Sequence, residues 1–200
     1  MKKYFVIIAI SLLVAVGCSI LKTISNISRL KFKLENVTDF KVSGISINNK
    51  TALKDFNTVD IVKLTAAVAK GEMPVTFILN VDAKNPNDGS GGYPATDISI
   101  KSFAWKLFVD QKETISGNIS SPVSVPGKGE SKVIPLEIKF DLFYFFKDKG
   151  FESLMNLALN LGGAKGSASQ LKLIAEPVLG TPIGDLKYPE PITIVSQQFN

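Results

Sequence analysis

The 200-residue sequence contains no histidine and a single cysteine. Without histidine the chain cannot form a Ser-His-Asp triad, a Cys-His dyad or a histidine-ligated zinc or iron site. One cysteine also excludes a disulfide within the chain. Any catalysis would have to rely on carboxylates or lysines alone. We therefore expect a protein that is not an enzyme, with no catalytic residue, no metal site and no cofactor.

Long runs of one residue type are also scarce. Lysine and arginine are spread along the chain without a run of five, so no nucleic-acid surface is expected. With 45% apolar and 20% charged residues, the composition is that of a globular protein. The N-terminal apolar run from Tyr4 to Val16 has about 13 residues, whereas a membrane-spanning helix needs about 20. A permanent transmembrane helix is therefore the weaker interpretation of this run.

The N-terminus has the layout of a secretory signal peptide, with Lys2 and Lys3 ahead of the apolar run and a small residue after it. The end of the run, Val14-Ala15-Val16-Gly17-Cys18, resembles the lipobox of bacterial lipoproteins. That resemblance implies lipid transfer to the Cys18 thiol, cleavage after residue 17 and acylation of the new amino terminus, for example with palmitate. The alternative is an incidental Cys18 in a signal peptide that is cleaved elsewhere.

A lipidated Cys18 would place the protein in the cell envelope, because two or three acyl chains anchor a protein stably to a bilayer. It would also block the one thiol, which could otherwise form wrong disulfides after export. Ser19 follows the cysteine. By resemblance to enteric lipoprotein sorting, this residue favours the outer membrane facing the periplasm in a Gram-negative bacterium. We expect residues 1–17 to be the signal peptide and residues 18–28 the lipidated cysteine and a tether.

Residues 29–200 are expected to form one domain, in which the hydrophobic pattern repeats mainly every two residues. Eight strands are predicted, two between residues 30 and 47 and the others at 75–83, 97–109, 113–119, 132–140, 171–175 and 191–195. Segments 58–70 and 148–161 instead have helical spacing. Trp105 is predicted to be a central packing residue. The pattern as a whole predicts a mainly β fold, a β-sandwich with two short inserted helices.

The run LTAAVAKGEMPVTFILNVDAKNPN joins a helix to an aliphatic strand that ends in Asn85-Pro86-Asn87. A strand with a central aromatic residue, a second strand and a proline-glycine turn follow it. This order resembles the late embryogenesis abundant type 2 family, also described as the water stress and hypersensitive response domain, over about residues 30–195. The resemblance implies an immunoglobulin-like or fibronectin-III-like sandwich, no catalytic residues and a role in desiccation or stress protection. The stretch 141–167 is longer than we expect for the corresponding part of a family member.

The turn Asn85-Pro86-Asn87 is the one site defined by a motif, and we expect its role to be structural. Asn85 can cap its own backbone and Pro86 fixes φ. A hard cation such as calcium is the alternative, since oxygen ligands from a loop suit it. A calcium loop that begins at Asp82 would need Asp or Asn at its third position. Lys84 stands there, so the pattern is not met.

The most unusual local feature is the aromatic run Phe143-Tyr144-Phe145-Phe146. In a strand or a helix, such a run faces more than one way, so at least one ring is exposed unless the second helix covers it. Two interpretations stay open. The rings pack into the core beneath segment 148–161, or they form an apolar docking surface for lipid or a partner protein.

Two functions are compatible with these features. The first is a non-enzymatic, lipid-anchored envelope protein with a stress-related binding or protective role, expected to be a monomer. The second is a structural or docking subunit of an envelope assembly, which would use the aromatic run or a free strand edge. The partners expected are a membrane, through the lipid, and a protein or apolar ligand.

Overall fold

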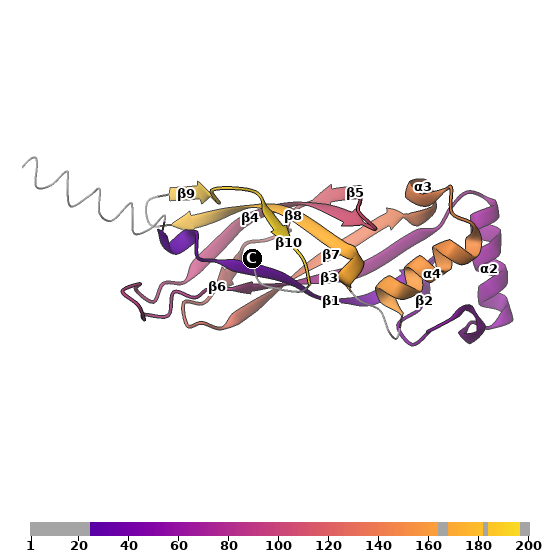
Figure 1. Cartoon of the computed structure of the whole chain (residues 1–200), viewed down its shortest axis with the longest axis horizontal. Helices are drawn as coiled ribbons and strands as arrows, with labels where there is room; N and C mark the ends of the chain where they lie inside the picture. The colour runs from indigo at the N-terminus through magenta and orange to yellow at the C-terminus, as the bar shows by residue number, and fades with distance from the viewer. Residues whose placement is uncertain (1–24, 164–167, 182–183, 197–200) are drawn as a thin grey trace, which may run out of the picture.

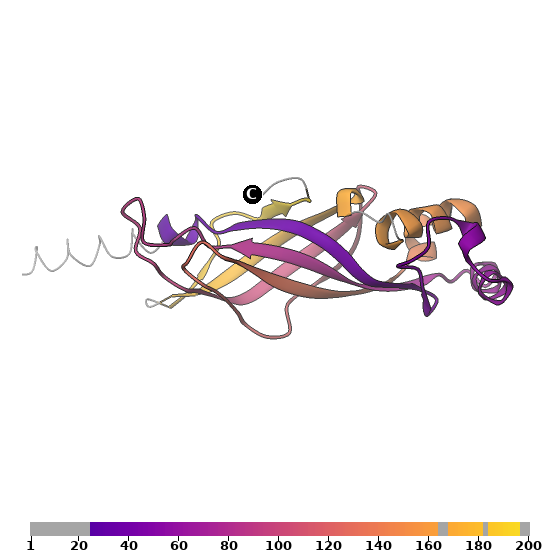
Figure 2. The ribbon, with the colours of Figure 1, turned by 90° about the horizontal axis from the view of Figure 1, so that it is seen from below.

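The computed structural model describes residues 25–163, 168–181 and 184–196, and shows two antiparallel sheets packed face to face (Figures 1 and 2). The predicted mainly β sandwich with two inserted helices is confirmed. The signal peptide and Cys18 lie outside the described residues. Within the described part, no helix is both long and apolar enough to cross a bilayer.

The first sheet has the strand order β2-β1-β3-β7. Its strands are β1 (Lys31–Val42), β2 (Ile45–Ser46), β3 (Pro74–Lys84) and β7 (Ser131–Asp141). The predicted strands at 75–83 and 132–140 match β3 and β7 to within one residue at each end. Every second residue is buried from Val75 to Ala83 in β3 and from Ile134 to Phe140 in β7, and this alternation allowed both strands to be predicted from the sequence.

The second sheet has the order β10-β8-β4-β5. Its strands are β4 (Ile98–Val109), β5 (Lys112–Gly117), β8 (Leu171–Thr181) and β10 (Ile192–Ile194), while β6 (Val123–Val125) pairs with β4 and β9 (Gly184–Lys187) pairs with β8. Neither β6 nor β9 was predicted, because strands of three or four residues are too short to show a clear alternation of apolar and polar residues. β8 continues six residues beyond the predicted end, through a proline and a glycine that are both weak strand formers.

Apolar side chains from the two sheets form the core between them. Phe32 on β1 and Phe103 on β4 are fully buried, with ring centres 5.4 Å apart. Trp105 is also buried, as predicted. On one side of the sandwich the sheets are joined directly, because the Leu34 backbone N–H donates to the Val195 carbonyl at 3.0 Å.

Residues 25–27 are helical and lie at one end of the sandwich, and the other helices gather at the opposite end (Figure 1). They are α2 (Thr58–Ala69), α3 (Leu142–Phe146) and α4 (Phe151–Gly162), with short 3-10 turns η1 (Leu53–Asp55) and η2 (Ala168–Gln170). Asn57 caps α2, since its side-chain oxygen accepts from the Asp60 backbone N–H at 2.8 Å. α3 was not predicted as a separate helix. It forms directly after β7, where the aromatic run leaves the sheet.

α4 meets β1 through a close contact between Gly162 and the buried ring of Phe40. A Cβ atom on Gly162 would lie 2.1 Å from Cγ of Phe40, which is itself stacked on Phe77 with centroids 4.9 Å apart. We therefore expect Gly162→Ala to lower the free energy of unfolding by about 1–3 kcal/mol, as overpacking typically does. Urea unfolding of the chain made without residues 1–17 measures the change.

Gly150→Ala is the matched control for this substitution. Gly150 precedes α4 with φ −67°, and no atom lies within 4 Å of a Cβ built there. We expect this variant to stay within about 0.5 kcal/mol of wild type. Similar destabilisation by both substitutions would show that the Phe40 contact is not the cause.

Candidate functional site

The two predicted sites lie at opposite ends of the sandwich. β3 starts beside the helices and runs to Lys84, so Asn85-Pro86-Asn87 lies at the far end, next to residues 25–30 (Figures 1 and 2). We call the end with α2, α3 and α4 the helical end, and the end with residues 25–30 and 85–97 the tether end. β1 runs between them, and its 12 residues span about 36 Å from first to last at roughly 3.3 Å per step.

At the tether end, Asn85 is fully buried and hydrogen-bonded through both polar atoms of its side chain. Its Nδ2 donates to the carbonyls of Thr96 at 2.8 Å and Val125 at 3.2 Å. Its Oδ1 accepts from the backbone N–H of Asn87 at 3.1 Å and from Nδ2 of Asn87 at 2.9 Å. Asn85 thus ties the end of β3 to the following loop and to β6.

Asn87 extends this arrangement to the start of the described chain. Its Nδ2 also donates to the Asn26 carbonyl at 2.8 Å, and its Oδ1 accepts from Nη1 of Arg29 at 3.2 Å. The Arg29 guanidinium in turn lies 3.7 Å from the centre of the Tyr93 ring. Every side-chain nitrogen and oxygen of Asn85 and Asn87 therefore has a partner inside the protein.

Two acidic residues that follow this turn, Asp88 and Asp97, also accept hydrogen bonds from within the protein. The Asp88 carboxylate accepts from the backbone N–H and hydroxyl of Ser90, and these bonds hold its pKa below the ordinary value. Asp97 accepts from the Gly127 backbone N–H at 2.8 Å. Among the described residues, no group of three or more acidic or cysteine side chains is placed to hold a metal ion.

The folded domain begins earlier than residue 29. Asn26 and Ile27 are 8% and 3% exposed, although both belong to the segment 18–28 that the sequence assigned to the tether. The Tyr188 hydroxyl lies 3.1 Å from the carbonyl oxygens of Ser28 and Leu30, and burial raises the pKa of this phenol. The apolar residues Ile20, Leu21, Ile24 and Ile27 recur at helical spacing, which is also compatible with a short helix on the domain, and residues 25–27 are helical.

At the helical end, the aromatic run divides between core and surface. Phe146 is buried, Phe143 and Phe145 are half-buried, and Tyr144 exposes 74% of its surface. Phe145 contacts Phe140 and Tyr144 edge-on, at centroid distances of 5.8 and 5.0 Å. Rings in van der Waals contact thus lead from the core to the surface.

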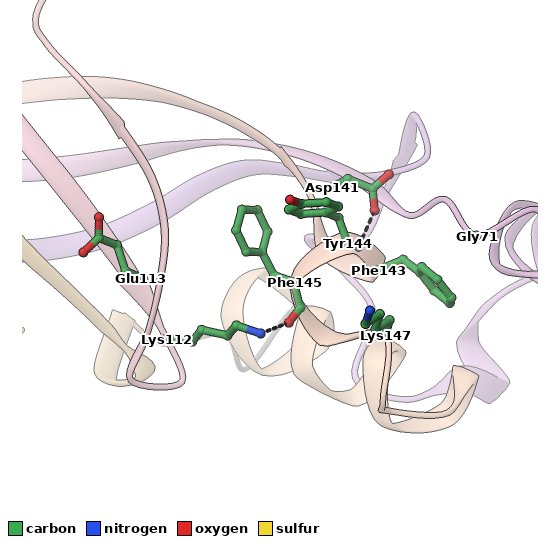
Figure 3. Close-up of a pocket in the computed structure, with 8 residues that line it drawn as sticks. All are labelled: Gly71, Lys112, Glu113, Asp141, Phe143, Tyr144, Phe145 and Lys147. Atoms are coloured by element: carbon green, nitrogen blue, oxygen red, sulfur yellow. Dashed lines mark hydrogen bonds between the residues drawn. The ribbon is translucent and has the colours of Figure 1, made fainter.

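The exposed and half-buried rings line a cleft of about 680 Å³, which we call the aromatic cleft (Figure 3). Its volume lies in the range of about 300–1,000 Å³ found for small-molecule sites. The lining residues are Gly71, Lys112, Glu113, Asp141, Phe143, Tyr144, Phe145 and Lys147.

Asp141 fixes the position of α3 at this cleft. Its carboxylate accepts from the Tyr144 backbone N–H at 3.1 Å, which caps the helix, and from the Met73 backbone N–H at 3.0 and 3.1 Å. Lys112 reaches across from the β4–β5 hairpin and donates to the Phe145 carbonyl (Figure 3). Lys112 and Lys147 were not predicted as site residues, since exposed lysines carry no pattern that assigns them to a site.

Exposed apolar side chains also concentrate at the helical end. Of the large apolar residues in the described part of the chain, Val59, Val62, Val133 and Tyr144 are exposed. All except Val133 lie on α2 or α3. α2 leads into Gly71, which lines the aromatic cleft beside the Phe143 ring. The helical end therefore combines a cleft with a neighbouring apolar helix face.

No family model matches the chain, and no curated protein matches it. Among solved structures, a candidate late embryogenesis abundant (LEA) protein is 17% identical, with a TM-score of 0.39, covering 95% of this chain and 85% of its own. A protein from Archaeoglobus fulgidus is 9% identical, with a TM-score of 0.35, covering 62% and 82%. A structural genomics target is 7% identical, with a TM-score of 0.33, covering 81% and 86%. All three TM-scores lie below 0.5, so we assign no function from them.

Proposed function

We propose that this chain is a non-enzymatic, lipid-anchored protein of the cell envelope that binds an apolar ligand in the aromatic cleft. The observation that carries the proposal is the set of half-buried and exposed rings that line a cleft of about 680 Å³. Aromatic rings supply large contact areas to apolar ligands. Anchoring rests on the lipobox resemblance at Cys18, and the stress-related role on the resemblance to late embryogenesis abundant type 2 proteins.

The neutral fluorescent probe N-phenyl-1-naphthylamine tests binding in the cleft. It is titrated into the mature chain made without residues 1–17 and with Cys18→Ser, which leaves every contact described above unchanged. We expect the wild-type cleft to bind the probe and Tyr144→Ser to weaken binding about tenfold, since an aromatic contact contributes about 1 kcal/mol or slightly more.

Val133→Thr is the matched control for Tyr144→Ser. Val133 is 41% exposed but lies on β7, away from the cleft. We expect this variant to bind the probe as the wild type does. If the mature chain fails to bind the probe, or if both variants lose binding equally, the cleft is not the binding site.

A docking subunit is the second candidate function, and the exposed Val59 and Val62 of α2 favour it. Deletion of residues 141–163 is not a suitable test, because α3 and α4 contribute core residues such as Leu142 and Leu154. Chemical crosslinking in intact cells, comparing Val62→Lys with Val133→Lys, is more specific. A docking role predicts a crosslinked product that only the α2 variant loses.

A further inference from the structure

The aromatic cleft contains four charged groups, of which the two carboxylates are already engaged. Both oxygens of Asp141 accept hydrogen bonds from backbone N–H groups. Glu113 pairs with Lys106, which lies outside the cleft, at 3.4 Å. Among the described residues, neither carboxylate forms an ion pair with Lys112 or Lys147, while both contribute negative charge to the cleft.

Neither ammonium group of the cleft is ion-paired with a carboxylate of the described residues. Within the part of the chain that the structure describes, Lys112 donates to the Phe145 carbonyl and lies 5.6 Å from the centre of the Phe146 ring. Lys147 makes no hydrogen bond or ion pair with any described residue. Figure 3 shows Lys112 at the Phe145 carbonyl and Lys147 at the end of α3, on the side of Phe143.

We propose that the ligand of the aromatic cleft is a small amphipathic anion, with an aryl or acyl body and one carboxylate, sulfonate or phosphate group. This rests on the proposed function of the cleft as an apolar binding site. The rings would hold the body, and Lys147 with Lys112 would bind the anionic group, because charge-assisted hydrogen bonds are the stronger kind. The cleft volume of about 680 Å³ fits a ligand of this size.

A pair of probes that differ by one charged group tests this inference. N-phenyl-1-naphthylamine is neutral, and 1-anilinonaphthalene-8-sulfonate carries an added sulfonate on the same ring system. We expect the wild-type mature chain to bind the sulfonate about tenfold more tightly than the neutral probe. Lys147→Met should bring the ratio of the two affinities to about one, and this ratio is the readout, because methionine removes the charge and keeps the apolar stem.

Lys63→Met is the control, since Lys63 is exposed on α2 and does not line the cleft. It should preserve the preference for the sulfonate. Tyr144→Ser should weaken the binding of both probes.

The outcomes separate the two proposals. Equal affinity of the wild type for both probes, or a preference that survives Lys147→Met, would overturn the anionic ligand and leave an apolar cleft. Failure of the wild type to bind either probe would overturn the cleft as a binding site as well. If laurate displaces the sulfonate probe and dodecanol does not, the preference for an anionic group also holds for ligands with an acyl chain.

Discussion

Asn85→Ala should lower the free energy of unfolding by about 3–5 kcal/mol, a large part of the roughly 5–15 kcal/mol that stabilises a typical domain. The substitution removes four hydrogen bonds from a fully buried position. The carbonyls of Thr96 and Val125 would lose the Asn85 amide, and the Asn87 N–H would lose its acceptor. A buried polar group left without a partner costs about 1–3 kcal/mol.

Urea unfolding of the mature chain, followed by the fluorescence of the single tryptophan, measures this effect. Asn36→Ala is the matched control, because Asn36 is exposed and accepts one side-chain hydrogen bond, from Nδ2 of Asn80 at 2.7 Å. We expect it to change stability by less than about 0.5 kcal/mol. If both variants lose a similar free energy of unfolding, the buried hydrogen bonds of Asn85 do not stabilise the fold more than an exposed one does.

Much of the fold could be predicted because one face of each long strand is buried. The alternation in β3, β4 and β7 is directly visible in the sequence, and the spacing of apolar residues defined α2 and α4. The spacing of apolar residues could not identify α3 as a separate helix. A five-residue segment in which every residue is apolar has no polar face, so its helical form depends on the Asp141 cap and on the packing around it.

The sites were less predictable than the fold, because their partners are distant in the sequence. The sequence points to Asn85-Pro86-Asn87 as a turn, but gives no sign that Asn87 bonds to Asn26, 61 residues away. Lys112 and Phe145 are similarly separated by 33 residues. The lining of the aromatic cleft emerges only when the β4–β5 hairpin is placed beside α3 (Figure 3).

The arrangement of the two ends has a consequence for an anchored protein. Because Asn26 is already held by Asn87, only residues 19–25 would connect a lipidated Cys18 to the fold. Seven residues reach at most about 25 Å when extended. The tether end would then lie within about 25 Å of the bilayer, and with β1 perpendicular to the membrane the aromatic cleft would lie about 36 Å further out. The cleft would thus be open to a soluble ligand.

Cys18→Ser should abolish acylation completely, which makes it the sharpest test of the anchor. We expect the intact mass of the membrane-extracted wild type to begin at Cys18 and to include two or three acyl chains. The serine hydroxyl cannot replace the thiol that lipid transfer requires, so the variant should carry no acyl mass. The apolar run of an uncleaved signal peptide could still hold the variant at the membrane, so mass is more decisive than fractionation.

Ser19→Asp provides the control, because it leaves the thiol intact. This variant should keep the acylated mass and, in a Gram-negative bacterium, shift from the outer to the inner membrane if the enteric sorting rule applies. An unacylated wild type, or one that begins at another residue, would contradict the anchor. The binding proposal would remain, because the lining of the aromatic cleft comes entirely from residues 71–147 and owes nothing to the N-terminus.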